Sequence, residues 1–208
     1  MRKILIFLFI LLAGCAQIKE KPSLRIEGKI AIAPFEVPTR PQDVISGYLI
    51  DPSIQIKKEI LLELDNELMQ KISKRENIQI IPKNFVEQCK EIIIYKEKYT
   101  SLNPVDKWVK IGKCIPADYI LVPQLLLFKE RIGGEWGVEE PAKVIIAFNL
   151  IDVNNKTLIK NYIFKEKQQP LLENMLTIKK FIKRGGKWVS AIELAKEGIE
   201  IGIKEIGL

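Results

Sequence analysis

Five segments of the chain have the alternation of apolar and polar residues, or the short apolar run, that predicts β-strands. They are residues 29–35, 78–82, 119–128, 143–153 and 157–165. Segment 143–153 is the clearest, because its apolar residues occupy both alternating faces, as is typical of a strand in the middle of a sheet. Within 119–128, Pro123 indicates a bulge or an edge position.

Apolar residues spaced three and four apart predict helices between and after these strands. The helices are expected at about 51–75, 85–96, 104–109, 171–183 and 191–206. Three of their starts carry a local capping signal, at Asp51-Pro52, at Asn103-Pro104, and at Ser190, which forms a capping box with Glu193. The order β-α-β-α-α-β-β-β-α-α predicts a single α/β domain, with helices packed on a mixed five-stranded sheet.

The first residues have the layout of a secretory signal. Arg2 and Lys3 supply positive charge, residues 4–12 are apolar, and the small residues Ala13 and Gly14 follow. The apolar run is too short to span a bilayer stably. Residues 1–14 are therefore predicted to be a signal peptide.

The tetrapeptide Leu12-Ala13-Gly14-Cys15 resembles the lipobox of bacterial lipoproteins. In that family a diacylglyceryl group is attached to the cysteine thiol, the signal is removed just before the cysteine, and the new amino group is usually acylated. The resemblance implies that Cys15 is the first residue of the mature chain and carries acyl groups such as palmitate. Several chains anchor a protein firmly, whereas one chain anchors it only marginally. The alternative is an ordinary secretory signal, or an N-terminal anchor, with a cysteine there by chance.

The residues after Cys15 indicate which membrane would hold the protein and how the domain would be joined to it. In well-studied Gram-negative bacteria an aspartate at the next position tends to retain lipoproteins in the inner membrane, so Ala16 favours the periplasmic face of the outer membrane. Residues 15–27 are expected to form the lipidated N-terminus and a flexible tether, because this stretch is charged, contains Pro22 and shows no period. Residues 28–208 would form the single domain.

Composition argues against several classes of function. The chain has a net charge of +7, but its charges lie in mixed runs with no basic stripe, so a nucleic-acid partner is not expected. It contains no histidine, which removes the commonest general base and the commonest metal ligand. Without histidine or a CxxC pair, neither a metal site nor a cofactor is expected.

Two cysteines, Cys89 and Cys114, remain once Cys15 is assigned to the anchor. An exported domain lies in an oxidising compartment, so a Cys89–Cys114 disulfide is one expectation. Two buried free thiols are the other, and the sequence leaves the choice open.

Three stretches together are similar to one superfamily. KIAIAPF opens the domain, Ala117-Asp118 precedes the strand at 119–128, and a hairpin ends in a charged strand. This arrangement resembles the superfamily of the TolB N-terminal domain, the curli secretion lipoprotein CsgG and the lipoprotein activators of penicillin-binding proteins; the C-terminal part resembles uncharacterised lipoproteins of that shape. The resemblance implies an envelope protein that binds other envelope proteins. A pore is disfavoured, because no long amphipathic segment could supply transmembrane strands.

Candidate chemistry is sparse. Ser190 has no histidine to activate it and is better explained as a helix cap. Several glutamates could serve a cell-wall hydrolase, but nothing in sequence marks one as buried with a raised pKa; they are Glu135, Glu139, Glu140, Glu166 and Glu173. Arg131 and Trp136 flank a glycine-rich turn, where exposed tryptophan and arginine are favoured binding anchors. The alternative is that Trp136 folds back onto the core.

These observations favour a non-enzymatic, lipid-anchored periplasmic adaptor or accessory protein of an envelope complex. Its expected partners are the membrane, through the lipid on Cys15, and envelope proteins. The alternative function is a ligand-binding accessory subunit of a transport or secretion system. A cell-wall hydrolase is the least favoured of the three.

Overall fold

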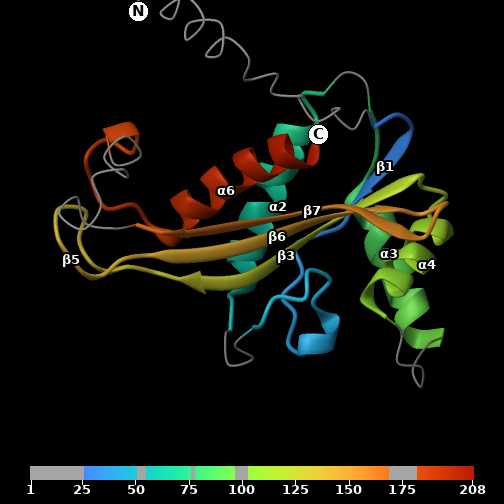
Figure 1. The fold of residues 1–208 in the computed structure, drawn as a ribbon, viewed down its shortest axis with the longest axis horizontal. Helices are drawn as coiled ribbons and strands as arrows, with labels where there is room; N and C mark the ends of the chain where they lie inside the picture. The colour runs from blue at the N-terminus through green and yellow to red at the C-terminus, as the bar shows by residue number, and fades with distance from the viewer. Residues whose placement is uncertain (1–25, 51–54, 76–77, 97–102, 169–181) are drawn as a thin grey trace, which may run out of the picture.

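The computed structural model describes residues 26–50, 55–75, 78–96, 103–168 and 182–208. Its centre is a five-stranded mixed sheet in the order β2-β1-β3-β6-β7 (Figure 1). The strands are β1 (Lys29–Ile32), β2 (Gln79–Ile81), β3 (Tyr119–Lys129), β6 (Lys143–Asp152) and β7 (Thr157–Lys167). β1 runs parallel to β2 and β3, while β6 runs antiparallel to β3 and β7. The predicted α/β fold with a five-stranded mixed sheet is confirmed.

Helices pack on both faces of this sheet. They are α2 (Lys58–Ile72), α3 (Lys83–Lys96), α4 (Pro104–Cys114) and α6 (Ala191–Ile206), with a 3-10 turn, η1 (Pro41–Asp43), in the loop after β1. Asn103 accepts a hydrogen bond from the Val105 amide at the start of α4, and the predicted capping box of Ser190 and Glu193 opens α6. Most of the helix predicted at 171–183 lies outside the described residues.

The predicted start of the first helix is wrong. Residues 55–57 are not helical, and α2 begins only at Lys58, after Lys57, which makes no side-chain cap. Ile56 packs against the core from this non-helical stretch. These three non-helical residues separate α2 from the predicted cap at Asp51-Pro52, which lies outside the described residues.

One face of the sheet carries the main core. Side chains of β1, β3, β6 and β7 pack there against α2 and α6. Helix α6 approaches the sheet closely at two glycines: a Cβ on Gly198 would lie 2.6 Å from the Phe164 ring, and a Cβ on Gly202 would lie 2.3 Å from the Phe148 ring. Ile26 is also buried in this cluster, so the folded domain includes a residue that the sequence assigns to the tether.

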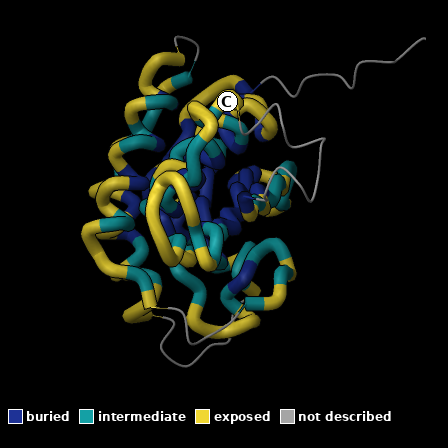
Figure 2. The backbone as a smooth tube through the Cα atoms, turned by 90° about the vertical axis from the view of Figure 1, so that its left-hand side faces the viewer, coloured by how far each residue is buried: buried dark blue, intermediate teal, exposed yellow. Residues whose placement is uncertain are grey.

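The opposite face is covered in two parts. Helices α3 and α4 bury a smaller cluster against β1 and β3, including Ala31, Ile120 and Trp108. The loop between β1 and α2 covers a third cluster around Leu126 and Ala147. Viewed from one end of the molecule, the buried interior is enclosed by intermediate and exposed backbone (Figure 2).

Pro123 lies inside β3, at the level where β1 has already ended at Ile32. Its carbonyl oxygen accepts a hydrogen bond from Glu36 N at 2.9 Å. Because N and O of one residue point to the same side of a strand, the absent N–H of Pro123 faces this irregular segment rather than a regular neighbouring strand. The register irregularity with β6 lies nearby, between Leu125 and Leu127.

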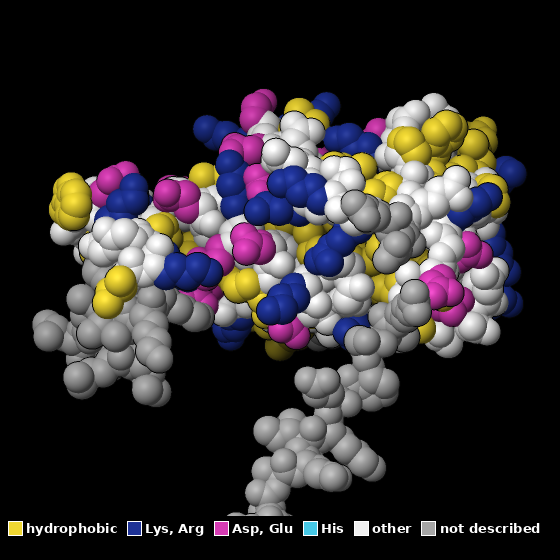
Figure 3. Space-filling view, turned by 90° about the horizontal axis from the view of Figure 1, so that it is seen from above, with side chains coloured by type: hydrophobic (Ala, Val, Ile, Leu, Met, Phe, Trp, Pro, Cys, Tyr) yellow, Lys and Arg dark blue, Asp and Glu magenta, His cyan; other side chains and the backbone are white. Residues whose placement is uncertain are grey.

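Within the described ranges, no helix combines the length and the apolar character needed to cross a membrane. The face that carries α6 shows lysine and arginine interspersed with aspartate and glutamate (Figure 3), which agrees with the mixed charge runs of the sequence.

Candidate interaction surface

The glycine-rich turn lies at the tip of a two-stranded hairpin, formed by β4 (Ile132–Gly133) and β5 (Val138–Glu140) at the far end of the long axis from α3 and α4 (Figure 1). Gly133 has a φ of +113°, and a Cβ there would lie 2.6 Å from the Gly137 carbonyl oxygen, so the turn needs glycine at this position. Trp136 is 84% exposed, and Ile132 in β4 of the same hairpin is 48% exposed. Of the two placements open from sequence, the structure has Trp136 exposed.

The hairpin backbone is tied to the segment that precedes α6. Trp188 N donates to the Glu135 carbonyl oxygen at 2.8 Å, and Lys187 Nζ lies 3.3 Å from Glu135 Oε1. The Arg131 guanidinium donates to the Trp188 carbonyl oxygen. Arg131 is therefore engaged in holding the hairpin in place, while Trp136 points into solvent beyond these ties.

The segment that precedes α6 and holds the hairpin is itself held by side-chain contacts. The buried side chain of Gln168 donates to the Lys187 carbonyl oxygen at 2.8 Å and accepts from Val189 N at 2.9 Å. Arg184 lies between Glu166 and Glu197, with N–O distances of 3.0 and 2.9 Å. Burial alone would lower the pKa of Arg184, but its hydrogen bonds and the charges of both glutamates outweigh that effect and raise it.

The start of α6 is held in the same region. Glu130 accepts from Ala191 N through both carboxylate oxygens at 3.1 Å. Glu193 accepts from Ser190 N at 2.7 Å, and this backbone hydrogen bond is the main cause of its lowered pKa. A carboxylate is favoured near a helix N-terminus, so both acids stabilise the helix end that supports the hairpin.

The candidate carboxylates do not converge on one site. Glu135 pairs with Lys187, Glu140 pairs with Lys129, and Glu166 pairs with Arg184. Glu139 is exposed, and Glu173 lies outside the described residues. Across the part of the chain that the structure describes, no group of three acids or cysteines is arranged to hold a metal ion.

Sequence reasoning missed two buried carboxylates, Asp152 of β6 and Asp65 of α2, and the pKa of Asp65 is raised. Asp65 accepts a hydrogen bond from Phe35 N at 2.7 Å and lies 3.4 Å from Lys83 Nζ. Burial is the main cause of its raised pKa, which the hydrogen bond from Phe35 N partly offsets. The available signal was its place beside Leu64 and Leu68 on the apolar stripe of the helix. Its contacts tie α2 to the segment after β1.

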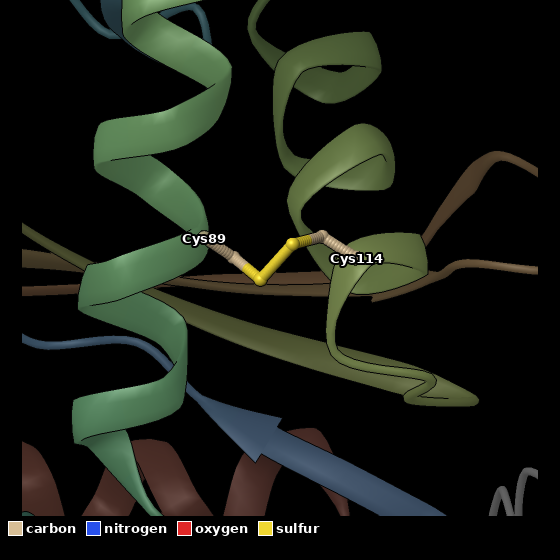
Figure 4. Close-up of a disulfide and its surroundings, with 2 residues drawn as sticks. All are labelled: Cys89 and Cys114. Carbon is tan, nitrogen blue, oxygen red and sulfur yellow. A yellow bond between two sulfur atoms is a disulfide. The ribbon is translucent and has the colours of Figure 1, made fainter.

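The two cysteines face one another across α3 and α4 and are joined as a disulfide, with Cα atoms 5.9 Å apart (Figure 4). That separation is within the range that a disulfide spans without backbone movement. Cys89 is buried, whereas Cys114 at the end of α4 is exposed. The pair lines a cavity of about 400 Å³ between β2, α3 and the end of α4.

A smaller, more polar cavity of about 230 Å³ lies under the loop after β1. An ion pair between Lys90 and Glu36 spans it, and Lys90 Nζ lies 6.0 Å from the ring centre of Trp108. The buried Gln124 accepts from Ile45 N at 3.0 Å and donates to the Asp43 carbonyl oxygen at 2.8 Å. These bonds satisfy the polar groups around the cavity and hold the loop on β3.

The lipobox residues Leu12, Ala13, Gly14 and Cys15 lie outside the described residues, so the lipidation site stays a prediction. No protein-family model matches the sequence, and no curated protein matches it.

Several solved structures are similar in shape at low sequence identity. One is the PelC dodecamer from Paraburkholderia phytofirmans, with a TM-score of 0.46, 12% identity, and coverage of 91% of this chain and 94% of that chain. The LpoB C-terminal domain from Escherichia coli has a TM-score of 0.40, 10% identity, and coverage of 77% and 93%. Lipoprotein GNA1162 from Neisseria meningitidis has a TM-score of 0.37, 13% identity, and coverage of 76% and 96%. Similarity at this level carries no functional assignment, and the superfamily named from sequence stays a prediction.

Proposed function

We propose that this protein is a lipid-anchored accessory protein of the cell envelope that binds another envelope protein through the β4–β5 hairpin and catalyses no reaction. The observation that carries the proposal is Trp136, 84% exposed at the tip of a hairpin whose backbone is held by Arg131 and Trp188. Tryptophan is among the residues that most often dominate the binding energy of an interface. A segment that is already fixed loses less conformational freedom when a partner binds it.

The location in this proposal comes from the N-terminus. The resemblance of Leu12-Ala13-Gly14-Cys15 to a lipobox supports a lipid anchor on Cys15, and Ala16 favours the periplasmic face of the outer membrane. The pairing of Cys89 with Cys114 is in keeping with an oxidising compartment outside the cytoplasm. The anchor would confine the domain near the bilayer, which raises its effective concentration for a membrane-held partner.

Cross-linking in native membranes, followed by purification of the full-length chain, tests the hairpin. Wild type is compared with Trp136→Ala and with Leu49→Ala, a matched control because Leu49 is 85% exposed in a different loop. We expect wild type and Leu49→Ala to recover the same defined envelope proteins, and Trp136→Ala to recover about tenfold less or lower still. Equal recovery by all three proteins would contradict the role of the hairpin.

The same membranes test the anchor separately. Cys15→Ser has no thiol to acylate, so it is expected to lack the mass of the acyl groups, and that mass is the readout because signal removal follows acylation. A Cys15→Ser protein of wild-type mass and distribution would contradict the lipobox. Because this readout does not involve Trp136, anchor and hairpin can fail independently.

The cavity beside the disulfide favours a second candidate function, a ligand-binding accessory subunit of a transport or secretion system. Ligand sites are typically concave, mostly apolar and between about 300 and 1,000 Å³, and this cavity of about 400 Å³ fits that description. A ligand-dependent rise in melting temperature is the general test of this alternative.

A further inference from the structure

The cavity beside the disulfide has walls that are almost entirely apolar. Phe85, Cys89 and Ile92 face it from α3, Ile81 faces it from β2, and Ile115 faces it from the end of α4. Residues 85, 88, 89 and 92 follow the i, i+3, i+4, i+7 spacing, so a single stripe of α3 forms one wall. Helices α3 and α4, whose residues line the cavity, lie at the opposite end of the molecule from the hairpin (Figure 1).

The apolar surface continues from the cavity to the solvent. Phe85 is 49% exposed and Ile92 is 46% exposed, although both are large apolar side chains. Contiguous exposed apolar surface next to a cavity commonly marks a ligand or interaction site. The disulfide between Cys89 and Cys114 joins the two helices that form the walls, so it holds the cavity open in one shape.

Polar groups occur among the lining residues only as Lys29, Gln79 and Gln88, and Lys29 is the only charged one. Its backbone N–H donates to Asp118 Oδ2 at 2.8 Å, and Asp118 is also bonded by Asn154 Nδ2 at 3.3 Å. No ion pair engages the Lys29 ammonium group among the described residues. One cation beside an apolar cavity without acidic lining complements a ligand with an apolar body and an anionic end.

We propose that this cavity binds the acyl chain of a free single-chain amphiphile with an anionic head group, such as a long-chain fatty acid. The chain lies between Phe85, Ile92 and Ile115, and the head group lies near Lys29. A partner peptide is less well suited, because adding a strand to the sheet edge here would rely on β2, which has only three residues. The acyl groups expected on Cys15 are joined through neutral bonds, so they would leave Lys29 without a counter-charge. This site is separate from the hairpin and does not depend on the proposed partner.

The test uses a photoactivatable hexadecanoate, with the reactive group in its tail, added to membranes that contain the full-length chain. We expect cross-links on peptides that carry Phe85, Ile92 or Ile115, as mapped by mass spectrometry. Unlabelled hexadecanoate should compete at a concentration about two to five times lower than hexadecyltrimethylammonium, as expected of one exposed ion pair with Lys29. The two competitors share a tail but carry opposite charges, so each competing concentration is corrected for the measured partitioning of that competitor into the same membranes.

Three variants assign the signal to the cavity. Phe85→Glu should reduce labelling about tenfold or more, because it places an anion in the apolar wall, and Lys29→Glu should remove the preference for the anionic competitor. Leu62→Glu on α2 is the matched control, since Leu62 is 45% exposed and does not line the cavity, and it should label like wild type. A non-reducing gel that shows the Cys89–Cys114 bond in each variant checks that the fold is retained.

Several results would overturn the proposal. Labelling that is spread over the chain, or unchanged by Phe85→Glu in a folded protein, would mean that the cavity does not hold the tail. Labelling that appears only in Cys15→Ser would mean that the chain's own acyl groups occupy the cavity. A benzoylphenylalanine placed at position 85 that captures another protein rather than lipid would make this surface a protein interface. None of these results would bear on recovery of a partner through Trp136.

Discussion

The two faces of the sheet are closed in different ways. On one face, α2 and α6 form a continuous core with four strands, and glycines of α6 let the helix rest directly on Phe148 and Phe164. On the other, α3 and α4 cover one part and the loop after β1 covers another, which leaves separate small clusters. Both cavities described above lie on this second face.

The difference separates stability from recognition. Helix α6 packs directly on the sheet at two glycines, so substitutions on the α2–α6 face should act mainly on the free energy of unfolding. The α3–α4 face is held together by the disulfide and by the hydrogen bonds of buried polar side chains such as Gln124. These bonds fix its shape and leave the two cavities between its elements. Its exposed apolar side chains should therefore tolerate change with little loss of stability.

The largest effect on stability is expected from Phe148→Ala on the α2–α6 face. Phe148 is fully buried, lies under Gly202, and makes an edge-to-face contact with Phe35 at a centroid distance of 6.5 Å. Truncation should lower the free energy of unfolding by about 3–5 kcal/mol, measured by urea denaturation. A loss below about 1 kcal/mol would mean that the α6 face is less tightly packed than this comparison requires.

Removal of the disulfide on the α3–α4 face should produce the next largest effect on stability. The two cysteines are separated by 25 positions in sequence, and the chain-entropy model gives their bond about 3.5 kcal/mol of stabilisation. Reductant should lower the melting temperature of the wild type. The double variant Cys89→Ser/Cys114→Ser should have a lower melting temperature than the wild type without reductant, and reductant should not change it. If wild type and double variant melt together without reductant, the exported protein carries two free thiols instead.

Asp65 should add a smaller, pH-dependent effect where the two faces meet. Burial raises its pKa in the folded state, so the folded protein binds this proton more tightly than the unfolded chain does. Its favourable contribution is complete below the unfolded pKa of about 4 and is lost as pH rises through the folded pKa. Relative to Asp65→Asn, which keeps an oxygen for Phe35 N, wild type should lose stability between pH 4 and pH 7. The measurement is urea unfolding of both proteins across that range; the opposite slope would mean that the attraction of Lys83 outweighs burial.

Much of the fold could be predicted because its signals are local. Alternation located the strands, and the capping residues Asn103 and Ser190 act on amides within their own helical turn. The helix expected to start at Asp51-Pro52 is not continuous, because residues 55–57 are not helical and Ile56 packs against the core from this stretch. A local signal is reliable only where no tertiary contact competes with it.

The candidate surface depended on pairings that no local pattern contains. Trp136 was identified from its glycine-rich setting, but sequence could not show whether it is exposed. The hairpin that presents it is held by the hydrogen bond from Trp188 N to Glu135, 53 positions away in sequence, and by Arg131. The burial of Asp65 likewise depends on Phe35, which is distant in sequence. The cavity could not be predicted at all, since it is the space left between elements that sequence locates only approximately.

The smallest stability effect is expected at the hairpin tip, and it makes the binding test interpretable. The ties that hold the hairpin use the backbone of Glu135 and Trp188 and the side chain of Arg131, so Trp136→Ala removes none of them. Trp136→Ala and Leu49→Ala should each change the free energy of unfolding by less than about 0.5 kcal/mol in parallel urea titrations. With stability unchanged, a loss of partner in Trp136→Ala alone reports recognition. A loss above about 1 kcal/mol in that variant would instead mean that the indole packs on the domain in solution. Trp136 would then contribute to stability, as the α2–α6 face does, rather than to recognition.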